Sequence, residues 1–131
     1  MPDSPTWLNE NAFLHEAGAQ SMKTETTYRS GLRLFADWLQ HYRKAGYSKE
    51  DAWPLHPDRL TTDIILEYRN WLLANRSKAT LTTYMAAVVG YLNFLDGYDQ
   101  LPESVQLGKL QRQMARRQIE RNQAENVIDL D

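Results

Sequence analysis

The chain has 131 residues, with 15 lysines and arginines, 17 aspartates and glutamates, three histidines and no cysteine, and its formal net charge is -2. A single domain of this size can bury about two-thirds of its unfolded surface, and the lack of cysteine excludes disulfide bonds and thiolate metal sites. The longest apolar run is far shorter than the ~20 residues of a membrane span, and no basic residue precedes Lys23 as a secretory signal or transit peptide would require, so we expect a cytoplasmic protein.

A short helix is predicted around residues 9–17, where Phe13 and Leu14 could dock against the rest of the chain. A long helix is predicted over residues 21–44, because apolar residues recur there at steps of three and four. Basic residues in its last turn and Gly46 after it are typical of a helix C-terminus. The apolar stripe of this helix consists of Tyr28, Leu32, Phe35, Leu39 and Tyr42.

The segment of residues 47–60 contains two prolines and lacks a helical period, which predicts a loop. The apolar residues expected to tuck beneath this loop are Trp53 and Leu55. Thr61 or Thr62 can then cap a helix that ends near Asn75. The buried stripe of that helix is predicted to contain Ile64, Ile65, Tyr68, Trp71 and Leu72.

The next helix is predicted over residues 78–95, with Asp96 and Gly97 at its end. Its apolar stripe consists of Leu81, Tyr84, Met85, Val88, Tyr91, Leu92 and Leu95. A last helix is predicted from about Glu103, with a buried side formed by Leu107, Leu110 and Met114. Because no segment alternates as a strand does, the predicted fold class is all-α.

The charges are segregated along the chain, so the net charge says little about a polyanionic partner. Residues 1–20 and 122–131 are acidic and contain no lysine or arginine, whereas residues 108–121 carry five basic residues against one glutamate. Between residues 70 and 95 the only charges are Arg76 and Lys78. DNA phosphates would meet these local basic segments rather than the average charge.

Residues 21–28 and 77–84 carry the same pattern, a serine followed by threonine at the fourth position and tyrosine at the eighth. One interpretation is structural, because Ser and Thr satisfy backbone N–H groups at helix starts and two helices can converge on that solution. The other is functional, because Lys23 and Lys78 and the hydroxyls outside the apolar stripe would bind phosphate together with the helix N-termini. The residues alone leave both interpretations open.

The face of the 78–95 helix opposite Val88 is made of small residues, namely Ala79, Thr83, Ala86, Gly90 and Asn93. Another helix of the bundle is the favoured neighbour of Ala86 and Gly90. The polar first turn, through Thr83, fits a DNA groove better, because threonine and alanine can contact base edges there.

Together, these motifs resemble the core-binding domain of tyrosine recombinases, the phage-integrase family, over about residues 21–105. The motifs that carry the resemblance are Ser21-x-x-Thr24-x-x-x-Tyr28-x-x-x-Leu32-x-x-Phe35-x-x-Trp38-Leu39, then Thr61/Thr62 with Ile65, Tyr68 and Leu72, then Ser77-Lys78-Ala79-Thr80 and Phe94-Leu95. The resemblance implies a single orthogonal, SAM-like bundle of four to five helices that clamps double-stranded DNA opposite a larger catalytic domain. It divides the chain into an acidic leader (1–20), the clamp (21–105) and a basic helix or linker (106–131) toward an absent catalytic domain.

The positions that the resemblance places against DNA are Lys23, Thr24, Thr27, Lys78, Thr80 and Thr83. Phosphate neighbours expected by position are Ser21, Arg29, Arg76 and Ser77, and the linker adds Arg112, Arg116 and Arg117. The expected partners are double-stranded DNA and other recombinase protomers on it, with no cofactor, metal, membrane or small-molecule substrate.

The family's chemistry needs a tyrosine nucleophile with arginine, lysine and histidine, and the resemblance places them in the absent domain. We therefore expect no catalysis by this chain. Residues 56–59 spell His-x-x-Arg, but Pro57 disfavours a helix there and Tyr91 falls in a core stripe. One alternative is a non-catalytic helical protein-interaction module. A self-contained enzyme is disfavoured, because no nucleophile, base and orienting group occur at workable spacing.

Overall fold

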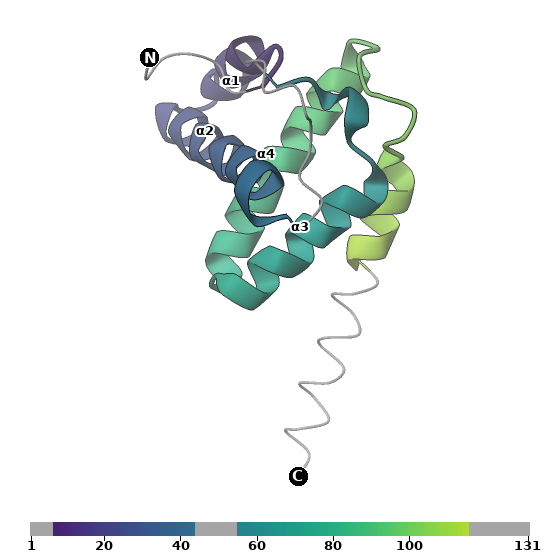
Figure 1. The fold of residues 1–131 in the computed structure, drawn as a ribbon. Coiled ribbons are helices and arrows are strands. Elements are labelled where there is room, and N and C mark those ends of the chain that lie inside the picture. The colour runs from purple at the N-terminus through teal and green to yellow at the C-terminus, as the bar shows by residue number, and fades with distance from the viewer. Residues whose placement is uncertain (1–6, 44–54, 116–131) are drawn as a thin grey trace.

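The computed structural model describes residues 7–43 and 55–115, and it confirms the predicted all-α fold class (Figure 1). The elements are α1 (Glu10–Gly18), α2 (Met22–Asp37), the π turn η1 (Trp38–Tyr42), the 3-10 turn η2 (Pro57–Arg59), α3 (Thr62–Asn75), α4 (Lys78–Gly97) and a last helical segment of residues 107–115. These ranges contain no strand, only a bridge between Trp7 and Leu55. None of the helices in the described ranges combines the length and hydrophobicity that a membrane span needs.

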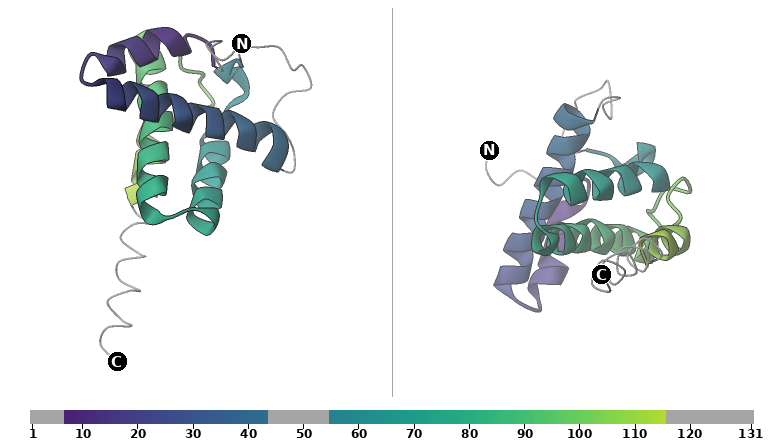
Figure 2. Two further views of the ribbon diagram at one scale, coloured as in Figure 1. Left: turned by 90° about the vertical axis from the view of Figure 1, so that its left-hand side faces the viewer. Right: turned by 90° about the horizontal axis from the view of Figure 1, so that it is seen from below.

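The helices form a hairpin with another helix lying across it. α3 and α4 are antiparallel neighbours joined by a short turn at Arg76 and Ser77, and α2 lies across them (Figures 1 and 2). α1 packs on α2 and on α4, and the most extensive contact between helices is that of α2 with α4. The core therefore lies between α2 and the hairpin.

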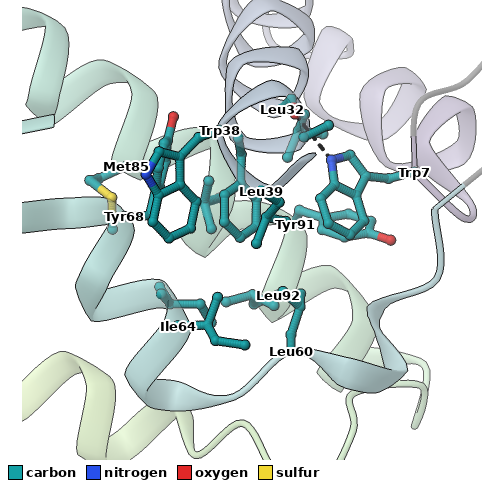
Figure 3. Close-up of a cluster of buried hydrophobic side chains, with 14 of the residues drawn as sticks. Trp7, Leu32, Trp38, Leu39, Leu60, Ile64, Tyr68, Met85, Tyr91 and Leu92 are labelled. Atoms are coloured by element: carbon teal, nitrogen blue, oxygen red, sulfur yellow. Dashed lines mark hydrogen bonds between the residues drawn. The ribbon is translucent and has the colours of Figure 1, made fainter. Parts of the chain in front are cut away.

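Aromatic side chains fill the space between α2 and the hairpin (Figure 3). The rings of Phe35 and Trp38 lie 4.7 and 5.3 Å from that of Tyr68, centroid to centroid. Most of the predicted stripe residues are buried. The exceptions are Tyr28, Trp71, Tyr84, Leu107 and Met114, which are partly exposed, and Tyr42, which is exposed.

The described residues before α2 belong to the same core. Trp7 is fully buried, its indole Nε1 donates to the Leu32 carbonyl at 3.0 Å, and its ring stacks on Phe35 at 5.3 Å (Figure 3). The Tyr91 hydroxyl donates to the carbonyl of Leu8 at 2.6 Å. The predicted docking residues of the short helix, Phe13 and Leu14, are buried as well. From residue 7 onward, the acidic leader therefore packs as part of the bundle.

The end of the first long helix differs from the prediction. At residue 38 the α-helix changes into η1, where the Arg43 N–H bonds the Trp38 carbonyl at 2.7 Å, and the backbone is extended at Arg43. The predicted end at residues 44–46 and the loop residue Trp53 lie outside the described residues. Leu55 is buried as expected.

The start of α3 and the start of the last helix are linked. Thr61 caps α3, because its hydroxyl accepts from the Ile64 N–H at 3.1 Å. Thr62, the other candidate cap, is buried and accepts from the Gln106 N–H at 2.9 Å instead. This bond holds the residues before the last helix in a turn, so that helix begins four residues later than the predicted Glu103.

Candidate nucleic-acid interface

The candidate interface is built on the crossing of α2 and α4. A Cβ atom placed on Gly31 would lie 2.7 Å from the Cβ of Ala87, so only a residue without a side chain permits this close approach. Positions 31 and 87 are also related by the offset of the sequence repeat, which pairs Ser21 with Ser77. The two repeated helices thus cross at equivalent positions, and the repeat is a feature of the tertiary structure.

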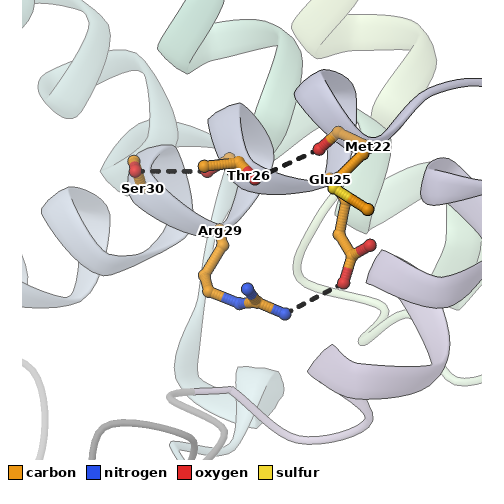
Figure 4. Close-up of polar contacts among 5 residues, drawn as sticks. All are labelled: Met22, Glu25, Thr26, Arg29 and Ser30. Atoms are coloured by element: carbon orange, nitrogen blue, oxygen red, sulfur yellow. Dashed lines mark hydrogen bonds and ion pairs between the residues drawn. The ribbon is translucent and has the colours of Figure 1, made fainter.

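The two helix starts are capped in the same way. The Ser21 hydroxyl accepts from the Thr24 N–H at 3.0 Å, and the Ser77 hydroxyl accepts from the Thr80 N–H at 3.2 Å. The two hydroxyls of each pair also contact each other, at 2.7 Å in α2 and 3.0 Å in α4. Within the first turns of the two helices, the Thr26 hydroxyl donates to the Met22 carbonyl and the Thr82 hydroxyl donates to the Lys78 carbonyl, each at 3.1 Å. Figure 4 shows the bond of Thr26. The capping interpretation of the repeat is confirmed, and both serine hydroxyls are engaged in it.

Four partly exposed threonines lie on the faces of α2 and α4 that meet at the crossing. Thr27 and Thr83 precede the crossing by one turn, and Thr24 and Thr80 precede it by two. The helices diverge from the crossing toward their N-termini (Figure 2), and packing leaves these side chains partly exposed. We call these residues the crossing threonines.

We call the parts of α2 and α4 that precede the crossing the two arms. Lys23 lies near the start of the α2 arm, and Lys78 lies at the start of the α4 arm. Both are exposed, and neither forms an ion pair within residues 7–43 and 55–115. Along the helix axes they precede the crossing by about 12–14 Å, at a rise of 1.5 Å per residue. The arrangement can hold one anionic group at each arm, with threonine hydroxyls between the two.

The arginines predicted to contact DNA differ in whether their charge is already neutralised by a carboxylate. Arg29 forms an ion pair with Glu25 at 3.0 Å and is partly buried (Figure 4). A Cβ on Gly18 would lie 2.8 Å from the same carboxylate, so the pair packs against the end of α1. Because the two charges neutralise each other, the pair adds little net charge. Arg112 is exposed on the last helix. The remaining linker residues, Arg116 and Arg117, lie outside the described residues.

Arg76 belongs to an aromatic cluster that sequence reasoning missed. Its guanidinium lies 5.1 Å over the Trp71 ring, and Trp71 packs against Tyr42 with ring centroids 5.3 Å apart. The Arg76 Nη1 also donates to the Asn75 carbonyl at 3.0 Å. Periodicity places Tyr42 and Trp71 on apolar stripes, but it does not indicate that Arg76, just past the end of α3, stacks on Trp71.

The His-x-x-Arg of residues 56–59 does not form a catalytic site with Tyr91. His56 is exposed before the short turn η2, whereas Tyr91 is fully buried and bonded to the Leu8 carbonyl. The part of the chain that the structure describes also contains no group of three or more acidic or histidine side chains that could hold a metal ion.

The small face of α4 is covered only in part. A Cβ on Gly90 would lie 3.3 Å from the ring of Phe13 and 3.6 Å from that of Tyr28, which confirms a helix neighbour at this position. Ala86 is exposed, so the same expectation is wrong there among the described residues. It borders an open groove of about 400 Å³ whose apolar lining includes Leu81, Met85, Val89 and Met114.

No family model, curated protein or solved structure matches this chain at a significant level.

Proposed function

We propose that this chain is the DNA-binding core-binding domain of a site-specific tyrosine recombinase. The observation that supports it most is the crossing of two equivalently capped helices at equivalent positions, each with an exposed lysine near its start. In this proposal the SAM-like bundle clamps double-stranded DNA in the cytoplasm, beside other recombinase protomers. It performs no catalysis, because the tyrosine nucleophile belongs to a separate catalytic domain.

The geometry suits a duplex because the two arms can contact different strands. Helix N-termini attract phosphate through their N–H groups and partial positive charge, and Lys23 and Lys78 add a full charge at each start. Their distance of about 12–14 Å from the crossing is comparable with the ~12 Å width of the major groove. The lysines then supply affinity, while the crossing threonines contact base edges.

The other predicted residues have supporting roles. Ser21 and Ser77 act through the caps that fix the helix starts. In this proposal Arg76 contacts the DNA backbone beside Lys78, and Arg112 follows the DNA along the linker; both side chains are exposed. Arg116 and Arg117 are proposed to extend that linker contact. The proposed reaction of the recombinase needs no metal or small-molecule cofactor from this domain.

Fluorescence anisotropy with a mixed-sequence duplex at several salt concentrations tests the proposal. Lys23→Glu and Lys78→Glu should each weaken binding to all duplexes, and each should make the dependence of log K on log salt shallower by at least about 1. Arg59→Glu is the matched control, because Arg59 is exposed on η2, away from the crossing. Thr83→Val should leave the salt dependence unchanged and alter the preference among duplex sequences.

Equal effects of Lys78→Glu and Arg59→Glu would contradict the proposed orientation on DNA. An absence of duplex binding by the wild-type chain even at low salt would favour the second candidate function, a helical protein-interaction module. The groove beside Ala86 supports that candidate, because methionine-lined apolar grooves accept partner helices. Association through this groove would be insensitive to salt and indifferent to DNA.

A further inference from the structure

We propose that Arg76 contacts DNA as a bidentate fork and that Trp71 is the positioning residue that holds it for this contact. The fork would take two acceptor atoms, either two oxygens of one phosphate or the O6 and N7 of a guanine. The inference rests on the proposed DNA-binding function and extends the interface from α4 to the end of α3.

The structure holds the Arg76 guanidinium from two sides. Its carbon lies 5.1 Å over the Trp71 ring, and its Nη1 donates to the Asn75 carbonyl at 3.0 Å. The end of α3 is itself fixed, because the Arg76 N–H bonds the Leu72 carbonyl at 2.8 Å and the Asn75 side chain bonds the Trp71 carbonyl at 2.8 Å. A guanidinium has five N–H groups, so the bond to Asn75 leaves the others for a ligand. A stacked arginine also loses little conformational freedom on binding.

Arg76 lies on the side of the hairpin that faces α2 and the crossing. The Trp71 ring beneath the Arg76 guanidinium packs on the Tyr68 ring with centroids 6.2 Å apart, and Tyr68 packs in turn on Phe35 of α2 and Trp38 of η1. Tyr84 packs against the crossing itself, with its Cα and Cδ1 3.5 Å from a Cβ on Gly31. Beyond α4, α2 continues across α3 into η1, whose Tyr42 packs on Trp71 (Figure 2). Both the crossing and Trp71 therefore lie along the line of α2 and η1.

The charges around Arg76 favour an anionic partner. Between residues 70 and 95, Arg76 and Lys78 are the only charged residues, so the hairpin offers no carboxylate to neutralise them there. The acidic residue of α3 near η1, Glu67, is paired with Arg43 at 2.9 Å. Arg76 precedes Lys78 by only two residues in the chain, so a nucleic-acid strand bound at Lys78 would also lie close to Arg76.

Substitutions at Arg76 can separate the effect of the planar guanidinium from the effect of its positive charge. Arg76→Lys keeps a positive charge but loses the planar fork, and we expect it to weaken duplex binding about tenfold. Arg59→Lys is the matched control, because Arg59 is exposed on η2, away from the crossing, and this change should keep the affinity within about twofold. Arg76→Ala then identifies the acceptor. A salt slope reduced by about 1 indicates a phosphate, and an unchanged slope with a relaxed sequence preference indicates a guanine.

A double-mutant cycle tests the role of Trp71. If Trp71 acts through Arg76, Trp71→Leu weakens binding about as much as Arg76→Lys does. The double variant then binds no more weakly than either single variant. Trp71→Phe, which keeps an aromatic ring, restores part of the affinity. Tyr98→Leu controls for loss of an exposed aromatic residue, because Tyr98 is 60% exposed and lies past the far end of α4. Thermal unfolding of each variant separates a loss of contact from a loss of fold.

The possible failures are distinguishable. Wild-type affinity in Arg76→Lys, with weakened binding in Lys78→Glu, would overturn the inference and leave the proposed function intact. Additive effects of Trp71→Leu and Arg76→Lys would overturn the role of Trp71. If Trp71→Leu does not fold, Trp71→Phe takes its place in the cycle, and Arg76→Lys still decides the fork because Arg76 is exposed. A wild-type chain that binds no duplex would remove the proposed function and this inference together.

Discussion

At the scale of single residues, Tyr68 combines a well-packed ring with an unsatisfied hydroxyl. Its ring packs against Phe35, Trp38 and Trp71, but its buried hydroxyl has no hydrogen-bond partner among the described residues. Burial raises the pKa of this hydroxyl well above its usual range, with Tyr84 acting in the same direction and Arg76 in the opposite one. Leaving a buried hydroxyl unpaired costs about 1–3 kcal/mol, so the ring rather than the hydroxyl stabilises the fold.

We therefore expect Tyr68→Phe to leave the free energy of unfolding at pH 7 unchanged or to raise it by about 1 kcal/mol. The folded-state pKa is raised, so the stability linked to this group is present below about pH 10 and is lost above it, where the unfolded chain releases the proton first. The variant should lose less stability than the wild type between pH 9 and pH 11. Urea denaturation at several pH values measures both effects.

Tyr98→Phe is the control for this experiment, because Tyr98 is largely exposed and its hydroxyl has little to lose or gain on folding. It should leave the stability at pH 7 unchanged. A loss of more than about 1 kcal/mol at pH 7 in Tyr68→Phe would mean that the hydroxyl makes a stabilising bond after all.

At the scale of elements, helix starts follow from local chemistry, whereas helix ends depend on distant segments. Ser21 and Ser77 cap their helices as the sequence predicts, since the partner N–H is three residues away. The π turn at the end of α2 brings Tyr42 onto Trp71, and the start of the last helix is fixed by Thr62. No local pattern indicates such contacts, so the sequence did not predict the π turn, and it placed the start of the last helix too early.

Some features of the candidate site could also be predicted from local sequence, whereas others depend on tertiary contacts. Helical periodicity places Thr27 and Thr83 outside the apolar stripes, and the structure brings them to one crossing. The spacing of Glu25 and Arg29 by four residues is a signal from which their ion pair could have been predicted. Arg76 and Trp71 are five residues apart across a helix end, so their stacking required the tertiary structure.

The crossing itself gives a prediction about two residues in contact. Gly31→Ala should lower the free energy of unfolding by about 1–2 kcal/mol, because overpacking at the Ala87 Cβ outweighs the ~1 kcal/mol gain in helix propensity. Ala87→Gly in the same chain should restore the lost stability, since it moves the methyl group to the other helix. Chemical denaturation of the four members of the cycle measures the coupling, which we expect to be about 1 kcal/mol or more. Additive effects would show that the two helices do not touch at these positions.

At the scale of the whole molecule, the bundle is closed by residues that composition assigns to a leader. The acidic composition of residues 1–20 does not reveal that Trp7 lies in the core and connects α2 to the segment before η2. Its partners Leu32 and Leu55 are far away in the sequence, so no periodicity near residue 7 indicates its burial. The N-terminal segment thus supports the α2 arm on which the proposed DNA contact depends.

The Trp7→Ala variant tests this dependence of the bundle on its N-terminal segment. Trp7→Ala removes the stacking on Phe35 and the bond to the Leu32 carbonyl, and we expect it to cost about 3–5 kcal/mol. A domain of this size is stable by only about 5–15 kcal/mol, so the variant should unfold at a much lower urea concentration. Met22→Ala, at a side chain that is 81% exposed, should change the midpoint little. A change below about 1 kcal/mol in Trp7→Ala would mean that the bundle closes without residue 7, and the clamp would then begin at α2 as the sequence resemblance implies.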